Sequence, residues 1–472
     1  MPGTGGQLLS SNFHPPPSLA MAVDTERFQQ AAARAAATVR SLPRGAHWLL
    51  ACDNDADGLC AAAAMAQALL RTGHRFTIRA SRDKTEAHYR ALFTEPWDGL
   101  MLLDKGTSHL AVLSSLAQTG RPVVVVDHHN QHGPVPSNVT LLNPRAEHLD
   151  GSRDASGATT AVALALALCG EPALAWGPIG LAGAVGDWQH MGGWQGWNLE
   201  LLQRCRTAGH IRQVPMPPLF GMDLADALVR EHAPGAATPA QARGLLEAAG
   251  VDPDREVDEL DEEGRTRLVS ALVAAHLAAG LPPPPPQALV VPVDFSARLG
   301  KSLRQLFRVV DACGRAGAAA TALAFLMGDA ASSAEAHALF AAYRSALLEG
   351  VRGLRDGGTV PRAAFQVAWT RSPEHTGMVA GIGMAHVVDP RLPLAILAHR
   401  PDGLVQVSTR GTHEQVAAGL DLGAACHAAA QAVGSEGGGH PVAAGAVVPE
   451  GKVEAFLAAL DAALAAQAKA AA

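Results

Sequence analysis

Three continuous apolar runs, each ending directly in acidic or histidine residues, constrain the fold of this chain most. They read HWLLAC at 47–52, GLMLL at 99–103 and PVVVV at 122–126. Continuous runs, as opposed to alternating ones, are typical of strands buried on both faces of a parallel sheet. The Ala/Leu-rich stretch Gly58–Thr72 after the first run is helical in pattern. We therefore expect an α/β fold whose first part is a parallel sheet flanked by helices.

Polar side chains follow each of these runs at the point where the strand ends. In open α/β sheets, ligands bind beyond the carboxyl ends of the strands, so these side chains should meet at one edge. A further apolar segment, Gly177–Gly186, reads as a helix or strand and ends in another aspartate. The candidates are Asp53, Asp55 and Asp57; Asp104; Asp127, His128 and His129; and Asp187.

Each of these motifs also has a structural interpretation. Aspartates before a glycine, as in CDNDADG, are often simple turns, and a lone Gly-Asp after an apolar segment is often a helix cap. On an extended strand end, however, Asp55 and Asp57 would point the same way. The DHH triplet after four valines could be a satisfied structural cluster, but buried charge and imidazole need partners.

Carboxylates combined with imidazole describe an oxygen-rich site suited to Mn²⁺ or Mg²⁺ and less to metals that prefer thiolates. Two such ions, about 4 Å apart, can activate water and stabilise both oxygens of a phosphoryl transfer. The chemistry that this set of residues serves best is phosphodiester hydrolysis.

The motif order CDNDADG, LLDKG, VVDHH and AVGD, over residues 48–187, resembles the DHH phosphoesterase superfamily. Near the C-terminus, EGGGHPVAAG at 436–445 resembles the glycine-rich signature of the DHH-associated C-terminal domain. Within the superfamily, ACGRAG at 312–317 and TGMVAGIGMAH at 376–386 are most similar to RecJ-like proteins of archaeal type. The resemblance implies a two-domain hydrolase with its active cleft between the domains and a preference for Mn²⁺.

The resemblance also implies a role for each residue of the metal motifs. Asp55 and Asp57 would each bind one of two ions, and Asp104 would bridge both. His128 and Asp187 would complete the second site, while Asp127 and His129 would orient ligands or contact substrate. Many relatives carry a histidine where this chain has Ala51, so the first ion would be held more weakly or would use Asp53 as a further ligand.

A second group of candidates lies near the C-terminus and would bind substrate. Consecutive glycines let the backbone approach a phosphate closely, and the following histidine can donate a hydrogen bond to it, although many triple glycines are flexible turns. Arg410 could pair with a phosphate or base, or be an exposed strand charge. Lys105 and His190 are weaker candidates. The substrate-binding set is Ser408, Arg410, Gly437, Gly438, Gly439 and His440.

The sequence predicts four segments. These are a disordered leader at 1–20, a DHH catalytic domain at 21–285, a helical linker at 286–360 and a smaller α/β substrate-binding domain at 361–472. The proline run 282–286 marks the first boundary inside the folded part. Residues 201–279 are mostly amphipathic helix in pattern, and the charged segment 252–267 within them is expected to be solvated.

Composition narrows the possible partners. A net charge of −7 gives no global attraction to polyanions, and six cysteines without CxxC spacing argue against a disulfide framework and a structural zinc site. No run is long and apolar enough to cross a bilayer, so we expect a soluble protein, and the cysteine pattern favours a reducing cytoplasm. About 27 residues follow Gly445, too few for an additional OB-fold, which favours short substrates over long strands.

The predicted function is hydrolysis of single-stranded DNA or RNA, as short oligonucleotides, to 5′-mononucleotides. Cyclic dinucleotide hydrolysis and a catalytically inactive scaffold are the alternatives, and a homodimer is compatible with each. The choice of DNA or RNA, the polarity of cleavage, the physiological metal and the oligomeric state stay open at this point.

Overall fold

The computed structural model describes residues 19–115, 120–219 and 223–471. The chain forms two compact units: unit 1 comprises residues 1–225 and 233–340, and unit 2 comprises residues 226–232 and 341–472. Most of the predicted leader, residues 1–18, lies outside the described residues, and its last two residues begin helix α1 (Leu19–Arg40). The predicted domain boundaries at 285/286 and 360/361 stay predictions.

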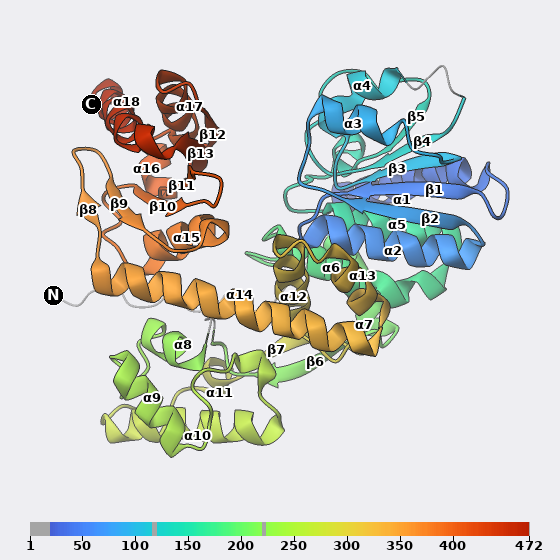
Figure 1. The fold of residues 1–472 in the computed structure, drawn as a ribbon. Helices are drawn as coiled ribbons and strands as arrows, with labels where there is room; N and C mark the ends of the chain where they lie inside the picture. The colour runs from blue at the N-terminus through green and yellow to red at the C-terminus, as the bar shows by residue number, and fades with distance from the viewer. Residues whose placement is uncertain (1–18, 116–119, 220–222, 472) are drawn as a thin grey trace. The chain divides into compact units, whose positions relative to one another are not determined.

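Unit 1 contains a five-stranded sheet in the order β2-β1-β3-β4-β5, with every pair of neighbours parallel (Figure 1). Its strands are β1 (His47–Cys52), β2 (Arg75–Ala80), β3 (Gly99–Leu103), β4 (Val123–Val126) and β5 (Val139–Leu142). The three apolar runs are β1, β3 and β4, and each is almost wholly buried. The predicted α/β class with a parallel sheet is confirmed.

Helices cover both faces of this sheet, which is why its strands are apolar throughout. On one face, α3 (Glu86–Leu92) and α4 (Leu110–Ser114) pack against alternate strand residues such as Leu49, Leu100 and Val123. On the other face lie α1, α2 (Ala56–Thr72) and α5 (Gly157–Cys169) (Figure 1). The helix predicted at 58–72 is α2, which begins two residues earlier than predicted, at Ala56.

The remainder of unit 1 is mainly helical. The expectation of helix across 201–279 is interrupted by β6 (Ile211–Met216), which pairs antiparallel with β7 (Val291–Ser296). The short helix α11 (Pro286–Leu289) directly precedes β7. The other helices are α6 (Gly177–Gly186), α7 (Gly196–Thr207), α8 (Leu224–Arg230, which continues into unit 2), α9 (Pro239–Ala248), α10 (Glu262–Ala278), α12 (Leu303–Arg315) and α13 (Ala319–Met327).

The prediction that the charged segment 252–267 is solvated is wrong for its centre. Glu256 and Asp258 are buried. Asp258 accepts hydrogen bonds from Ser302 Oγ (2.7 Å) and Arg304 Nε (3.0 Å), and Glu256 forms a 2.6 Å ion pair with Arg308. Buried carboxylates are tolerated because arginines on α12 neutralise them.

Unit 2 is built on a six-stranded sheet in the order β12-β13-β11-β10-β9-β8. Helices α17 and α18 pack with one face of this sheet in a common core, and α15 contacts β10 and β11. Its elements are the end of α14 (Ala330–Gly357), β8 (Val360–Pro361), β9 (Gln366–Trp369), α15 (Thr376–His386), β10 (Leu394–His399), β11 (Leu404–Arg410), α16 (His413–Ala417), α17 (Leu422–Ala432), β12 (Glu436–His440), β13 (Ala443–Pro449) and α18 (Val453–Ala471). The smaller C-terminal α/β unit is thus observed.

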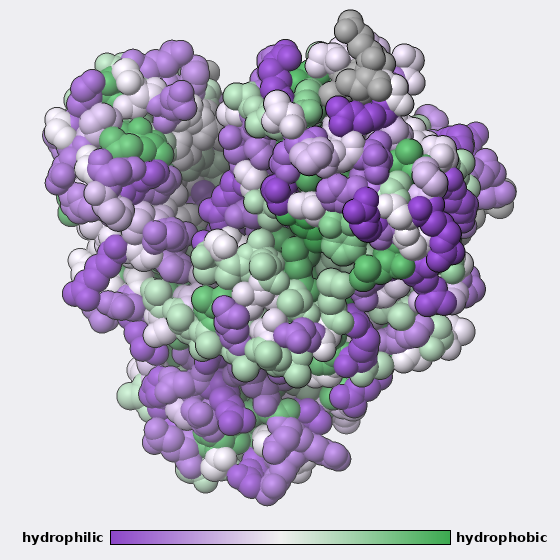
Figure 2. All heavy atoms as spheres, turned by 45° about the vertical axis from the view of Figure 1, so that its right-hand side comes forward, coloured by the Kyte–Doolittle hydropathy of each residue, from purple (hydrophilic) through white to green (hydrophobic). Residues whose placement is uncertain are grey.

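Among the described residues, no helix is long and apolar enough to span a bilayer. The face drawn in Figure 2 carries many hydrophilic residues around a central area of more apolar ones. Large apolar side chains with the highest exposure in the described chain include Val360, Trp188 and Met191.

Candidate metal centre and substrate-binding residues

Asp55 and Asp57 lie in the turn from β1 into α2. Asp55 is the N-cap of α2 and accepts a hydrogen bond from Gly58 N at 3.0 Å, while Asp57 belongs to the first helical turn. The expectation that both residues extend a strand is therefore wrong. A carboxylate caps the free N–H groups of a helix start better than it continues a strand.

Asp57 is fixed by the start of a second helix, α5. Its carboxylate accepts hydrogen bonds from Ser156 Oγ (2.7 Å), Gly157 N (2.6 Å) and Ala158 N (3.1 Å). The positive end of a helix stabilises a negative charge placed there. Sequence reasoning missed these partners, although Ser156 with Thr159 forms a capping box that signals a helix start.

Glycines allow this close approach. A Cβ atom on Gly157 would lie 2.8 Å from Asp57 Oδ2 and from Asp104 Oδ1, and one on Gly183 would lie 2.5 Å from Asp57 Oδ1. Side chains at either position would push the carboxylates apart. Two glycines in unremarkable helical segments thus shape the site.

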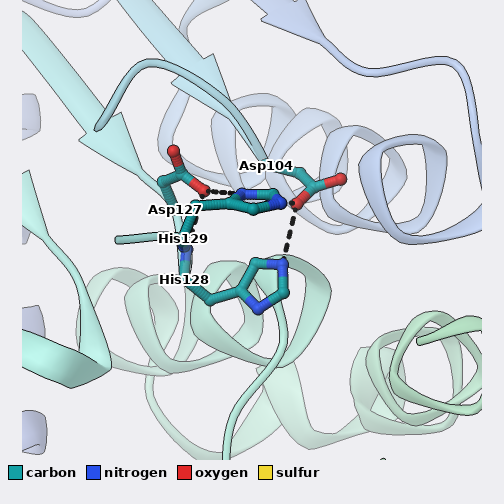
Figure 3. A group of neighbouring side chains, drawn as sticks. All are labelled: Asp104, Asp127, His128 and His129. Atoms are coloured by element: carbon teal, nitrogen blue, oxygen red, sulfur yellow. Dashed lines mark hydrogen bonds and ion pairs between the residues drawn. The ribbon is translucent and has the colours of Figure 1, made fainter. Parts of the chain in front are cut away.

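Asp104 follows β3 and has a left-handed backbone conformation, with φ of 58°. This conformation is costly for a residue other than glycine, although aspartate and asparagine tolerate it better than most. The buried carboxylate of Asp104 points toward the ring of His128, whose Nε2 is 3.2 Å from Asp104 Oδ1 (Figure 3).

His128 lies at the centre of the cluster. Its Nδ1 is 2.5 Å from the carbonyl oxygen of Gly151, so Nδ1 carries the proton that is donated there. Its Nε2 faces three carboxylates: besides Asp104, Asp187 Oδ2 lies at 3.3 Å and Asp57 Oδ2 at 3.8 Å. Asp187 is the C-cap of α6, so the alternative interpretation of a helix cap is confirmed, while its carboxylate also faces His128.

Asp127 turns away from this centre toward its neighbour His129 (Figure 3). Asp127 Oδ1 accepts from His129 Nδ1 at 2.7 Å, and Oδ2 accepts from Thr107 N at 2.9 Å and Thr107 Oγ1 at 2.5 Å. Burial would raise the pKa of Asp127, but the hydrogen bonds from His129 and Thr107 hold that pKa well below its usual range. Asp127 is therefore a charged group that orients His129.

The geometry gathers the predicted residues into three sets whose ligand atoms lie within 4.8 Å of one another. They are Asp57, His128 and Asp187; Asp53, Asp55 and Asp104; and Asp104, Asp127, His128 and His129. Two sets hold separate carboxylates, which is the arrangement that two cations need. Whether the residues ligate metal ions stays a prediction.

The electrostatics of the cluster favour bound cations. Burial, followed by the charges of Asp57 and Asp55, raises the pKa of Asp104 well above its usual range, and burial with Asp57 does the same for Asp187. Burial would lower the pKa of His128, but Asp104 and its carboxylate neighbours hold that pKa well above its usual range. Such crowded carboxylates retain protons until a cation replaces them.

Asp53 forms an ion pair with a lysine side chain. Lys84 Nζ lies 2.6 Å from Asp53 Oδ2, so an ion at the first site would compete with this ammonium group for Asp53. Ala51, which stands where relatives carry histidine, is wholly buried in β1. The Lys105 ammonium donates a 2.7 Å hydrogen bond to Ser81 O and is buried, which is a structural role.

The metal-free protein is expected to unfold at a lower temperature at about pH 7 than at about pH 5. Burial, with Asp53 nearby, raises the pKa of Asp55 to about 6, so the folded state binds this proton more tightly than the unfolded chain does. The contribution to stability is complete below about pH 4, the ordinary pKa, and is lost as the pH rises through about 6. Thermal unfolding after EDTA treatment measures this dependence.

Asp55→Asn is the matched control for this prediction. Asparagine is also a good N-cap residue but does not titrate, so the variant should show a weaker pH dependence. An unaltered dependence in Asp55→Asn would mean that another group is responsible.

In unit 2, Ser408 and Arg410 end β11. Ser408 Oγ lies 2.9 Å from Thr376 Oγ1 at the start of α15, and a Cβ on Gly377 would lie 3.3 Å from an Arg410 guanidinium nitrogen. Burial lowers the pKa of Arg410, and no ion pair with Arg410 is found among the described residues. An arginine in this situation is available to an anion.

The glycine motif forms the edge strand β12, so the alternative interpretation of a flexible turn is wrong. His440 pairs with Ala443, and Ala443 pairs with Arg410, so His440 and Arg410 end up at the same end of the sheet. Gly439 has φ of 148°, and a Cβ there would lie 2.6 Å from Ala443 O. These glycines therefore also serve close packing between strands.

Family comparisons place these two groups of residues in known domains. The model of the DHH family N-terminal domain matches residues 48–176, and the model of the DHHA1 domain matches residues 373–466. The chain belongs to the DHH superfamily. Its DHH domain carries the candidate metal residues up to His129, and its DHHA1 domain carries Ser408, Arg410 and the glycine strand. The superfamily consists of metal-dependent phosphoesterases.

Individual relatives are distant. An uncharacterised protein of Methanocaldococcus jannaschii is 22% identical over 419 residues, which cover 86% of this DHH protein and 91% of the relative. RecJ from Thermus thermophilus, in complex with Mn²⁺, matches with a TM-score of 0.57 at 21% identity. That match covers 96% of this chain but only 56% of RecJ. CDC45 from Entamoeba histolytica matches with a TM-score of 0.63 at 12% identity, covering 93% and 99% of the two chains.

Proposed function

We propose that this DHH protein is a metal-dependent phosphodiesterase that hydrolyses single-stranded DNA or RNA, as short oligonucleotides, to 5′-mononucleotides. The observation that carries the proposal is the convergence of Asp57, Asp104 and Asp187 on His128 Nε2, at 3.2 to 3.8 Å. Carboxylates crowded in this way are neutralised either by protons or by bound cations, and a divalent ion can replace the protons.

The residues present fit a pair of divalent ions. In this proposal Asp55 and Asp104 hold one ion, and Asp57, His128 and Asp187 hold the other. Asp104 serves both ions, which is supported by the 3.2 Å between its Oδ1 and His128 Nε2. Bound Mn²⁺ or Mg²⁺ would supply the Lewis acidity that activates water and neutralises charge on the phosphoryl group. The RecJ structures similar to this chain were solved with Mn²⁺ and with Mg²⁺, which supports this choice of metals.

The chain's own groups have distinct tasks in this proposal. The Gly151 carbonyl holds the His128 proton on Nδ1, which leaves Nε2 as the ligand atom. Asp127 orients His129, whose side chain is 45% exposed, by accepting a hydrogen bond from Nδ1. In its imidazolium form, the His129 ring can donate a second hydrogen bond, from Nε2, to the substrate phosphate. A preorganised donor of this kind stabilises charge that develops in the transition state.

Unit 2 would bind the substrate strand. Arg410 and His440 lie at one end of its sheet, with Ser408 beside Arg410. Guanidinium, imidazole and hydroxyl groups are donors that suit phosphate oxygens. This assignment is independent of the metal residues and can fail separately.

A substrate panel tests the proposal against its alternatives. End-labelled DNA and RNA oligomers and cyclic dinucleotides are incubated with Mn²⁺ or Mg²⁺, and products are resolved by length. Release of 5′-mononucleotides from linear strands supports the proposal. Selective opening of cyclic dinucleotides would favour that alternative, and a protein that binds Mn²⁺ but cleaves nothing would favour the inactive scaffold.

Catalytic efficiency is expected to be highest on short oligomers and to fall on long strands. The net charge of −7 indicates few phosphate contacts. Each neutralised phosphate contributes a slope of roughly 0.7 in log affinity against log salt for single strands, so the salt dependence should be shallow. Kinetics on oligomers of about 2 to 30 nucleotides, with binding measured across salt concentrations, check this. A preference for the longest strands with a steep salt slope would reveal a basic channel.

A further inference from the structure

A group of aromatic residues lies immediately after Asp187, the last candidate ligand in the chain. The proposed mechanism has no role for these residues. The loop between α6 and α7 reads WQHMGGW from Trp188 to Trp194. Trp188 and Met191 are each 63% exposed, which is unusual for side chains of this size. The rings of Trp188 and His190 are nearly parallel, at 19° and 6.3 Å between centroids, and His190 lies 6.0 Å from Trp194. We call Trp188, His190 and Trp194 the aromatic ledge.

The ledge is held in place by Gln189, which lies between its first two members. Gln189 is buried, donates to Gly151 O at 2.9 Å and accepts from Asn198 Nδ2 at 2.7 Å. The same Gly151 carbonyl oxygen accepts the hydrogen bond from His128 Nδ1. The ledge and the central histidine of the candidate metal centre are thus attached to one carbonyl oxygen.

The backbone also presents Trp188 outward. Trp188 has φ of 60°, a conformation that disfavours most non-glycine residues, and its N–H donates to Val185 O at 3.1 Å. Strain of this kind persists only where the surrounding structure imposes it. Trp188 directly follows Asp187 in the chain, so its backbone adjoins the candidate metal centre.

An exposed indole backed by two half-buried rings, close in the chain to a candidate phosphodiesterase centre, suits one ligand best. A nucleobase has a flat apolar face, and stacking it on an aromatic side chain is worth about 1–3 kcal/mol and tolerates any base. Burial, with Arg304 nearby, lowers the pKa of His190 to about 4, so this ring is uncharged at neutral pH and is easily desolvated. Tryptophan is the largest such surface available to a base.

We propose that the aromatic ledge stacks a nucleobase of the substrate strand next to the phosphodiester that is cleaved. This inference rests on the proposed function and adds the element that would distinguish nucleic acid from other phosphodiesters. It makes Trp188 a substrate-binding residue and Gln189 a positioning residue.

Trp188→Ala and Trp188→Phe test the ledge on two substrates. One is a single-stranded oligonucleotide, and the other is an abasic strand of the same length, which has the same phosphodiester backbone but no bases. Loss of one stack should raise KM for the normal oligonucleotide roughly 5- to 100-fold in Trp188→Ala. The effect on the abasic strand should be at least about tenfold smaller, and Trp188→Phe should retain most of the affinity. An equal increase in KM for both substrates, or no increase for the normal oligonucleotide, would contradict the proposal that the ledge stacks a base.

Trp369→Ala is the matched control. Trp369 is 48% exposed and stacks on His399 at 4.6 Å and 18°, but it ends β9, at the opposite end of the unit 2 sheet from Arg410. This variant should not discriminate between the two substrates.

Tryptophan fluorescence separates failure of the ledge from failure of the proposed function. In Ca²⁺, without turnover, binding of the oligonucleotide should quench emission of the wild type more than that of Trp188→Phe. If quenching depends on Trp188 but the protein has no hydrolytic activity, the proposal of base stacking is supported and the proposed enzymatic function is wrong. Equal quenching in both proteins would reject the ledge, whatever the activity.

Discussion

Asp104→Asn is expected to lower the hydrolysis rate about 1,000-fold or more while raising the melting temperature of the metal-free protein. We propose that Asp104 serves both halves of the centre, because its carboxylate groups with Asp53 and Asp55 and also with His128, and several kcal/mol of charge stabilisation would be lost with it. Asparagine tolerates the left-handed conformation with φ of 58°, so the backbone should be retained. Rates at saturating Mn²⁺ and melting curves in EDTA measure the two effects.

The opposite signs of these effects make the prediction specific. Burial and the charges of Asp57 and Asp55 raise the pKa of Asp104, so replacing it relieves repulsion when no cation is present. Activity within about tenfold of wild type would refute a bridging role. A lower melting temperature would mean instead that the carboxylate stabilises the fold.

Asp57→Asn is expected to lower activity to a similar extent but to destabilise the protein. Its carboxylate accepts hydrogen bonds from Ser156, Gly157 and Ala158, and an amide has one acceptor oxygen fewer for these donors. Leaving one buried donor unsatisfied costs about 1–3 kcal/mol, which corresponds to a decrease of roughly 1–4 °C in the melting temperature of a unit of this size.

Measuring Asp57→Asn and Asp104→Asn together distinguishes a metal ligand that also anchors α5 from one that does not. Circular dichroism melts in EDTA and in Mn²⁺ are compared for both variants. If Asp57→Asn melts at or above the wild-type temperature, the three hydrogen bonds contribute little and the anchoring role is wrong.

The sheet and the edge that gathers the candidate residues could be predicted from the sequence. Strands buried on both faces need continuous apolar runs, and β1, β3 and β4 have them. Polar residues directly after such runs must lie at the carboxyl edge of the sheet. This physical constraint is local, so it is visible without knowledge of the fold.

The partners of the site residues could not be predicted, because they come from tertiary contacts. Nothing near Asp57 in the sequence indicates that α5 begins beside it, and nothing near His128 indicates the Gly151 carbonyl. The strand β12 was missed because glycine is a poor strand former, and only its neighbours Ala443 and Ala444 explain why side chains are excluded there.

The order of the strands has a consequence for how the molecule acquires its activity. The candidate ligands follow β1, β3, β4 and α6, so they are brought together only when segments far apart in the chain have docked. Parallel pairing across such distances is slow, because the entropy of closing long loops is lost before the contacts form. We therefore expect the candidate ligand set for divalent ions to be complete only late in folding. They should prolong the lifetime of the finished protein far more than they speed its formation.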